Sequence, residues 1–319
     1  MPDINDINKE EDEFNIKELY LLIWFKKFFI LKVIGISTLL SIVLALLIQN
    51  TYTSKALLAP ANLDESLSSK LGEFSSLSSL SGIGLPGEIA DPTIEAVERI
   101  KSYDFFENYF LPRIELQNLF AVKKWHHEDN SLQYDNNIYN KELNKWVRKV
   151  RFPQKVIPSP QESYEVFIDI LKVSQDRKTS FVSISIDHKS PYIAKKWLDI
   201  IVNNINESMR EEDKAIASNA IIFLNESSLT TNNNQLKEAI ATLLEDQMQD
   251  LMLASAHKDY IFKTIDSPLA PEEKSSPNRI LIILFGIFFG TIFSFVIIAF
   301  NHFKVIFKKN LSSIDFSKK

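Results

Sequence analysis

Residues 267–300 decide the architecture of this chain: S-P-L-A-P-E-E-K-S-S-P-N-R-I-L-I-I-L-F-G-I-F-F-G-T-I-F-S-F-V-I-I-A-F. From Ile280 to Phe300 the sequence runs for 21 residues without a charge. At about 1.5 Å of rise per residue, a helix of that length crosses the roughly 30 Å hydrocarbon core of a bilayer. The stretch therefore predicts a transmembrane helix over 280–300.

Three prolines precede this span and two glycines lie within it. Pro268, Pro271 and Pro277 exclude a regular helix and hold the entering chain stiff and extended. Gly286 and Gly290 are four residues apart, so they share one helix face, where a second helix can approach closely. These five residues are the structural and interaction sites that we predict. The collar of prolines is expected to present the upstream domain at a fixed height above a membrane.

A second apolar segment lies near the N-terminus. Residues 28–48 are interrupted only by Lys32, whose long side chain can reach the interface. The leader, residues 1–27, begins acidic and becomes amphipathic, which predicts a short interfacial helix. A cleaved signal peptide fits poorly, because the leader is long and acidic and no small-x-small site follows the apolar run. We interpret 28–48 as a retained anchor.

The basic residues that flank the two spans predict the orientation. On one side they are numerous, whereas on the other side they are fewer and partly offset by Glu272 and Glu273. The positive-inside rule then places both termini in the cytoplasm and exports residues 51–278. The lysines on the cytoplasmic side are Lys26, Lys27, Lys304, Lys308 and Lys309.

Alternation and helical periodicity divide the exported part. Asp91-Pro92 predicts the start of a helix, while the Ser/Gly-rich segment 63–87 reads as a loop, either mobile or in contact with a partner. Residues 120–160 carry many aromatics and few periodic signals. Strands are predicted over 51–59, 165–173, 181–187 and 260–265. The apolar face of the helix is predicted to comprise Ile94, Val97, Ile100 and Phe105.

Residues 190–257 predict a helical hairpin. Ser190-Pro191 is expected to cap a helix of about 40 residues, which would extend roughly 60 Å. Its apolar period of 3.6 stops at a polar run, where the tip is expected near 232–234, and resumes at Leu236. Between Met209 and Phe223 the apolar stripe is wider than the short return arm can cover. This excess predicts an oligomer.

Composition excludes several classes of chemistry. The net charge is −5 without a long basic run, which argues against a nucleic-acid partner. The chain has no cysteine, so thiolate zinc sites, thiol catalysis and disulfides are excluded. Neither glycine-rich phosphate-binding motif occurs, so a nucleotide-binding kinase module is absent. We predict no cofactor.

The remaining polar candidates are scattered. Adjacent His126 and His127, followed by Glu128 and Asp129, could hold a metal only with a third ligand from elsewhere, and the alternative is a solvated loop. Carboxylate pairs are expected on solvated helix faces, and no nucleophile or zinc-protease motif is present. We therefore predict no catalytic residue and no metal site. The carboxylate pairs are Glu211-Glu212 and Glu245-Asp246, and the isolated histidines are His188, His257 and His302.

Several fragments together resemble the Wzz-type chain-length determinants, the polysaccharide co-polymerases of bacterial inner membranes. The proline collar and the glycine-spaced span are the most diagnostic part. The other fragments are E-F-N-I-K-E-L-Y-L-L-I-W, L-S-S-L-S-G-I-G-L-P-G with D-P-T-I-E-A, W-H-H-E-D-N-S-L-Q-Y-D, V-S-I-S-I-D-H-K-S-P-Y-I-A-K-K-W and L-M-L-A-S-A-H-K-D-Y-I-F-K-T-I-D. The return arm departs from the enterobacterial members by being short.

The resemblance implies an α+β membrane protein in which two transmembrane helices flank an exported α/β base with a long projecting helical hairpin. It also implies a ring of identical subunits that sets the length of a lipid-linked polysaccharide, such as O-antigen, with a separate membrane polymerase. An adaptor of a polysaccharide export machine is the alternative. The expected divisions are a cytoplasmic leader 1–27, a span 28–48, a periplasmic base 49–189, a hairpin 190–257, a return strand and collar 258–279, a span 280–300 and a cytoplasmic tail 301–319.

Overall fold

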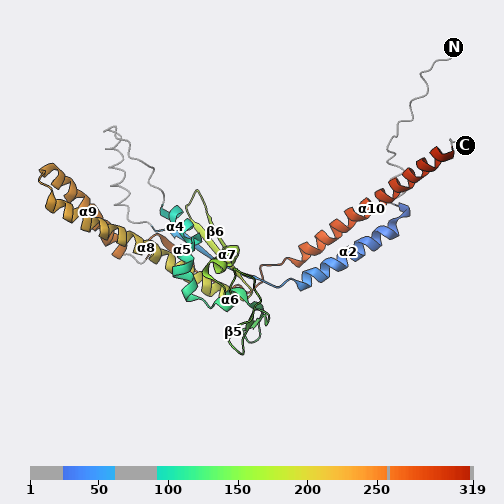
Figure 1. Ribbon diagram of the computed structural model, residues 1–319, viewed down its shortest axis with the longest axis horizontal. Coiled ribbons are helices and arrows are strands. Elements are labelled where there is room, and N and C mark those ends of the chain that lie inside the picture. The colour runs from blue at the N-terminus through green and yellow to red at the C-terminus, as the bar shows by residue number, and fades with distance from the viewer. Residues whose placement is uncertain (1–23, 62–91, 257–258, 317–319) are drawn as a thin grey trace, which may run out of the picture. The chain divides into compact units, whose positions relative to one another are not determined.

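The computed structural model describes residues 24–61, 92–256 and 259–316 (Figure 1). The predicted interfacial leader and the Ser/Gly-rich segment lie outside these residues, apart from the last residues of the leader. The chain divides into two compact units, one of residues 1–49 with 277–319 and the other of residues 50–276. Two helices thus flank a mixed helix and sheet body, as the α+β prediction required.

The first unit consists of two long apolar helices. Helix α2 covers Lys27–Leu47 and helix α10 covers Arg279–Phe316, of which Arg279–Asn301 is long and apolar enough to cross a membrane. Both predicted spans are therefore present as helices. Some hydroxyl groups inside them bond to their own helix, as where Thr38 Oγ1 donates to the carbonyl of Ile34 at 2.8 Å. Such bonding satisfies polar side chains where no water is at hand.

The body is built on a four-stranded antiparallel sheet in the order β6-β7-β1-β8. Strand β7 alternates buried and outward residues along its length, and Ala56 of β1 lies opposite its Ile184. The predicted strands at 51–59, 181–187 and 260–265 are confirmed with shifts of a few residues. The strands are β1 (Tyr52–Pro60), β6 (Leu171–Gln175), β7 (Val182–His188) and β8 (Phe262–Asp266).

The core lies between this sheet and the helices that cover it. Trp197 of helix α8 is buried and meets Phe110 edge to face, with ring centroids 5.8 Å apart. Phe110 also packs on Phe167 at 4.5 Å. Aromatic contacts therefore join three helical segments into one core. The covering segments are α4 (Pro92–Lys101), α5 (Tyr103–Phe105), the π-helix η1 (Phe106–Phe110), the 3₁₀ helix η2 (Leu111–Arg113), α7 (Pro160–Ile170) and the first half of α8 (Pro191–Thr230).

The predicted strand over 165–173 is wrong in its first part. Helix α7 runs to Ile170, and β6 begins only at Leu171. The Ser159 hydroxyl accepts from the backbone N–H of Glu162, and Pro160 stands at the first turn, so the helix has both a cap and a start signal. The alternating run E-V-F-I-D-I follows this cap. The helix cap and the burial of Phe167 outweigh the strand-like alternation of this run.

Two smaller details of the predicted helices are also wrong. Ile94 is 53% exposed, because α4 buries Thr93, Ala96, Val97 and Ile100 instead. The Ser190 side chain makes no capping bond to α8, although its carbonyl accepts from the N–H of Ala194 at 3.1 Å.

The aromatic stretch 120–160 forms a small lobe of two hairpins. Trp146 meets Tyr139 at 5.5 Å and Phe120 at 6.2 Å between ring centroids, both edge to face. Cross-strand aromatic pairs of this kind stabilise short strands that carry few ladder bonds. The elements are α6 (Leu116–Phe120), β2 (Val122–His126), β3 (Ser131–Tyr134), β4 (Tyr139–Asn140) and β5 (Lys145–Trp146).

The hairpin of long helices is confirmed. Helix α8 has 40 residues and α9 (Asn234–Ala256) has 23, so the return arm is short as the sequence predicted. At the tip, the Asn233 side chain accepts from the N–H of Gln235 at 2.9 Å and thereby caps α9. Figure 1 shows the two helices side by side at one end of the body.

Candidate functional site

The two glycines of α10 lie against α2 of the same chain. A Cβ added at Gly286 would lie 2.5 Å from Ser41 Cβ, and one added at Gly290 would lie 2.8 Å from Ser37 Cβ. Ser37 Oγ donates to the carbonyl of Gly286 at 2.8 Å. The second helix that the glycine spacing predicted is therefore α2 within the described chain. Small residues and an interhelical hydrogen bond are what hold apolar helices together in lipid.

The collar is non-helical from 267 to 278 and is tied to the start of β1. The N–H of Thr51 donates to the carbonyl of Ser276, and the N–H of Ser275 donates to the carbonyl of Thr51, both at 2.9 Å. Ser54 Oγ donates to the carbonyl of Leu269 at 2.8 Å, and Pro268 is buried. The two ends of the body are therefore bonded to each other. Pro271 lies between these contacts, and Pro277 directly follows them.

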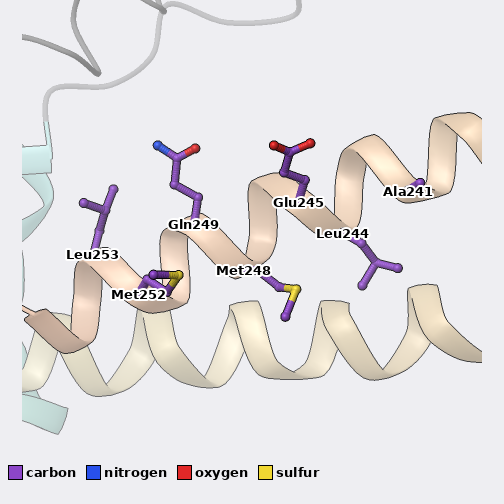
Figure 2. Close-up of a pocket in the computed structure, with 7 residues that line it drawn as sticks. All are labelled: Ala241, Leu244, Glu245, Met248, Gln249, Met252 and Leu253. Carbon is purple, nitrogen blue, oxygen red and sulfur yellow. The ribbon is translucent and has the colours of Figure 1, made fainter.

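The outer part of the hairpin exposes apolar side chains on both helices. Figure 2 shows a groove along α9 in which Leu244 and Met248 point toward α8, whereas Glu245 and Gln249 point away from it. A solvated helix pair seldom leaves so many large apolar groups in water. The exposed set is Ile216 (58%), Ile222 (58%), Phe223 (67%) and Leu229 (88%) on α8, with Leu236 (50%), Leu243 (50%), Met248 (56%) and Met252 (71%) on α9.

Polar contacts fix the middle of α8 to the body. The Tyr109 hydroxyl donates to Glu211 Oε2 at 2.5 Å, and Arg99 forms an ion pair with Glu212. Burial, then the bond to Glu211, raises the pKa of Tyr109. Both carboxylates lie on an exposed face, as expected, and they also anchor the helix to the body through these two contacts. Glu245 and Asp246 are exposed, as expected.

An amide clamp joins α8 to β8. The side-chain carbonyl of Asn206 accepts from the N–H groups of Ile261 and Phe262 at 3.1 and 2.9 Å. Its Nδ2 donates back to the carbonyl of Phe262 at 2.7 Å. Tyr260 then donates to Asp213 Oδ2 at 2.7 Å. Sequence periodicity gave no signal for these bonds, because they join residues about 50 positions apart.

His188 is a buried neutral group in the body. Its Nδ1 accepts from the N–H of Ser190 at 2.9 Å, and its Nε2 lies 3.0 Å from the carbonyl of Asn118, to which it donates. Burial lowers the pKa of His188 to about 4. Both ring nitrogens are thus used by backbone groups, and Trp197 covers the ring at 4.8 Å. This arrangement suits a structural histidine rather than a proton-transfer group.

The four residues His126, His127, Glu128 and Asp129, called the His126 group here, lie at the end of β2 and in the following turn. His127 packs on Trp125 with ring centroids 5.6 Å apart, and Asp129 accepts from the N–H of Ser131 at 3.2 Å. Hydrogen bonds from Ser131 lower the pKa of Asp129. Across residues 24–61, 92–256 and 259–316, no group of three or more metal-binding side chains comes together. His257 and the side chain of His302 lie outside the described part.

Comparison with protein families gives one match. Residues 12–110 match the Wzz family, described as "Chain length determinant protein". The match covers about a third of the chain. The matched segment runs through α2, β1 and α4 to the end of η1, so it includes the first span and the edge of the core. The resemblance stated above is thereby confirmed.

Two solved structures of co-polymerases are similar to this chain. One is a "full-length bacterial polysaccharide co-polymerase", 12% identical with a TM-score of 0.37, covering 89% of this chain and 96% of the other. The second is a fragment of WzzB from Salmonella Typhimurium, 14% identical with a TM-score of 0.31, covering 71% of this chain and 100% of that one. No curated protein sequence matches the chain. At these TM-scores the superpositions carry no argument, so the Wzz match carries the assignment.

The Wzz match supports regulation of polysaccharide chain length. Two apolar helices at the ends of the described chain, with a mixed body between them, fit an inner-membrane protein of this family.

Proposed function

We propose that the chain is a non-enzymatic scaffold that sets the length of a lipid-linked surface polysaccharide, O-antigen or a related polymer. It works as a ring of identical subunits beside a separate membrane polymerase. Both termini lie in the cytoplasm and the body of residues 50–276 lies in the periplasm. The observation that carries this proposal is the uncovered apolar surface on the outer hairpin of a chain with a Wzz match.

The uncovered surface supports self-association because each side chain gains from leaving water. Full burial of one Ile or Phe side chain is worth about 1.5–3 kcal/mol. Ile216 and Phe223 lie seven residues apart on α8, two helical turns, and are both more than half exposed. In a ring each contact joins two different surfaces, so this stripe of one copy would be covered by another face of its neighbour.

The bonded collar supports a role through shape. A body whose two chain ends are tied together by Thr51 and Ser276 cannot splay when load is applied to one span. A scaffold that holds or measures a growing chain needs such stiffness.

The first experiment disrupts the uncovered surface. Ile216→Ser with Phe223→Ser should reduce the assembly, measured by light scattering in mild detergent against the 36.7 kDa chain, and shift the polysaccharide ladder on a gel. Ile94→Ser is the matched control, because Ile94 is similarly exposed at 53% but lies on α4. A monodisperse monomer of the unaltered protein would refute the proposal.

The second experiment separates the helices of the membrane unit. Gly286→Leu with Gly290→Leu cannot fit against Ser41 and Ser37, so α2 and α10 must move apart. The polysaccharide length should change while the protein still inserts. Gly35→Leu is the control, since a Cβ there meets nothing within 4 Å. Unchanged length in the double variant would show that this contact has no functional role.

A further inference from the structure

One loop of the body is strongly basic in an otherwise acidic chain. Residues 145–157, K-W-V-R-K-V-R-F-P-Q-K-V-I, are called the basic loop here. No acidic residue occurs between Glu142 and Glu162, whereas the whole chain has a net charge of −5. The basic residues of the loop are Lys145, Arg148, Lys149, Arg151 and Lys155.

Arg148 holds the base of the loop in a defined shape. Its guanidinium donates to the carbonyls of Val156 at 2.8 Å and Lys155 at 2.6 Å, and it pairs with Glu162 at the start of α7. The N–H of Gln154 donates to the carbonyl of Arg151 at 2.9 Å, which closes the tip. The bonds fix the two ends of the loop, so its tip is presented outward as a preformed surface.

Most other side chains of the loop face solvent. Phe152 is 97% exposed, Ile157 60%, Val156 46% and Val147 41%. Lys145, Lys149, Arg151 and Lys155 are exposed as well, and none forms an ion pair within the part of the chain that the structure describes. Among the described residues, unpaired cations therefore surround an apolar tip that remains exposed.

We propose that the basic loop docks on the headgroups of anionic phospholipids. Basic side chains are attracted to an anionic bilayer surface, and aromatic or aliphatic side chains among them enter the headgroup boundary. A soluble polyanion would use the charges but would leave Phe152 and Ile157 in water. The combination of both groups in one loop favours lipid.

The connections within the body place the loop's lobe beside the start of β1. Trp146 packs on Tyr139, whose ring lies 5.6 Å from Tyr134 of β3. Strand β3 pairs with β2, and Trp125 of β2 meets Tyr52 at 5.3 Å. Tyr52 follows the end of α2 at Leu47 by five residues. These contacts join the lobe to the start of β1 within the body.

The test uses the full chain in lipid nanodiscs and exploits its lack of cysteine. Val156→Cys carries an environment-sensitive fluorophore, which leaves Phe152 in place. With phosphatidylglycerol present, the emission should shift to the blue and be quenched by nitroxide-labelled lipid; with phosphatidylcholine alone, both effects should be small. Glu238→Cys, exposed on α9 and outside the apolar set of the hairpin, is the control label and should not respond.

Charge and apolar variants separate the two contributions. Each basic residue near an anionic surface is worth about fivefold in association, so Lys149→Gln, Arg151→Gln and Lys155→Gln together should weaken contact roughly 100-fold. Phe152→Ser should reduce quenching without removing the salt dependence. Lys237→Gln on α9 is the charge control. All variants are checked for unchanged melting, which these exposed positions should preserve.

Two outcomes would overturn the proposal. A fluorophore that responds equally in both lipids, or in neither, contradicts anionic-lipid docking. A response that requires added soluble dextran sulfate and ignores the lipid would assign the loop to an anionic polymer instead.

Discussion

The inner and outer halves of helix α8 are built from similar residues but lie in different surroundings. In the inner half, Trp197, Ile201 and Ile205 are buried against the sheet and the aromatic core. In the outer half, Ile216 and Phe223 are 58% and 67% exposed. One continuous apolar pattern therefore meets two environments: its first half completes a core, and its second half leaves large apolar side chains exposed.

The difference follows from what each half can pack against. The inner half meets a four-stranded sheet, η1 and α7, which together cover a wide apolar face. Within the described residues the outer half packs along α9, whose 23 residues extend about 35 Å. Two helices alone bury one stripe of each, so apolar residues outside that stripe remain in water. Sequence periodicity cannot predict which apolar residues stay exposed, because it indicates a helix but not the elements that pack against it.

The largest expected effect comes from a core residue of the inner half. Trp197→Ala should lower the free energy of unfolding by about 3–5 kcal/mol, because the cavity cannot collapse among Phe110 and His188. Phe223→Ala should change it by less than about 1 kcal/mol in the separated subunit. Urea unfolding followed by far-UV circular dichroism measures both. Equal losses would mean that the outer half belongs to the core.

Lowering the pH should next reduce the stability of the body around the inner half of α8, where His188 packs on Trp197. His188 titrates near pH 6.5 when unfolded, but burial lowers its pKa in the folded body to about 4. Below pH 6.5 the unfolded chain therefore binds a proton that the fold excludes, and stability falls by up to about 1.4 kcal/mol per pH unit down to pH 4. Above pH 6.5 this contribution is constant. His188→Gln should remove the dependence.

The outer half should respond in the opposite sense. Burial, then the charges of Asp246 and Asp213, raises the pKa of Asp250 on α9. Protonation of this carboxyl group is favoured in the fold, so the hairpin gains stability as pH falls through that raised pKa. Amide hydrogen exchange at pH 7 and pH 5, corrected for the intrinsic exchange rates, measures the local stability of each half separately. Equal changes in both would contradict this assignment.

A smaller effect is expected where the halves join. Tyr260→Phe removes the hydroxyl that donates to Asp213 and leaves a partly buried carboxylate without this donor. The loss should be about 1–3 kcal/mol, which is the typical cost of removing a bond to a charged group. Tyr192→Phe is the control, because Tyr192 is 53% exposed. If both variants melt alike, the bond does not hold the return strand to α8.

The long elements of the fold could be predicted from the sequence because their apolar patterns repeat over many residues. Helix α8 repeats its apolar residues for about nine turns, and β7 alternates over seven residues. The run E-V-F-I-D-I in α7 was misassigned because six residues fit either period. The start signal was present in S-P-Q-E, residues 159–162, and would have corrected it.

The candidate site was predicted in part. Four-residue spacing indicated the contact face of Gly286 and Gly290, but not that Ser37 and Ser41 oppose it, since spacing carries no information on a partner. The basic loop was missed although its charge run is visible in the sequence. Its exposure depends on Arg148 reaching Glu162, a bond between positions that no local pattern connects.

The smallest expected effect comes from the histidine-rich turn. Replacing His126, His127, Glu128 and Asp129 together by alanine removes the packing on Trp125 and one turn bond, all at exposed positions. Stability should change by less than about 1 kcal/mol, and regulation of polysaccharide length should persist on a gel. Loosening the collar by Pro271→Ala with Pro277→Ala should instead broaden the length distribution, because it acts on shape. Cleavage of the polymer by the purified protein, abolished by one carboxylate substitution, would contradict a non-enzymatic role. The exposed apolar residues of the outer half of α8 would then need another explanation.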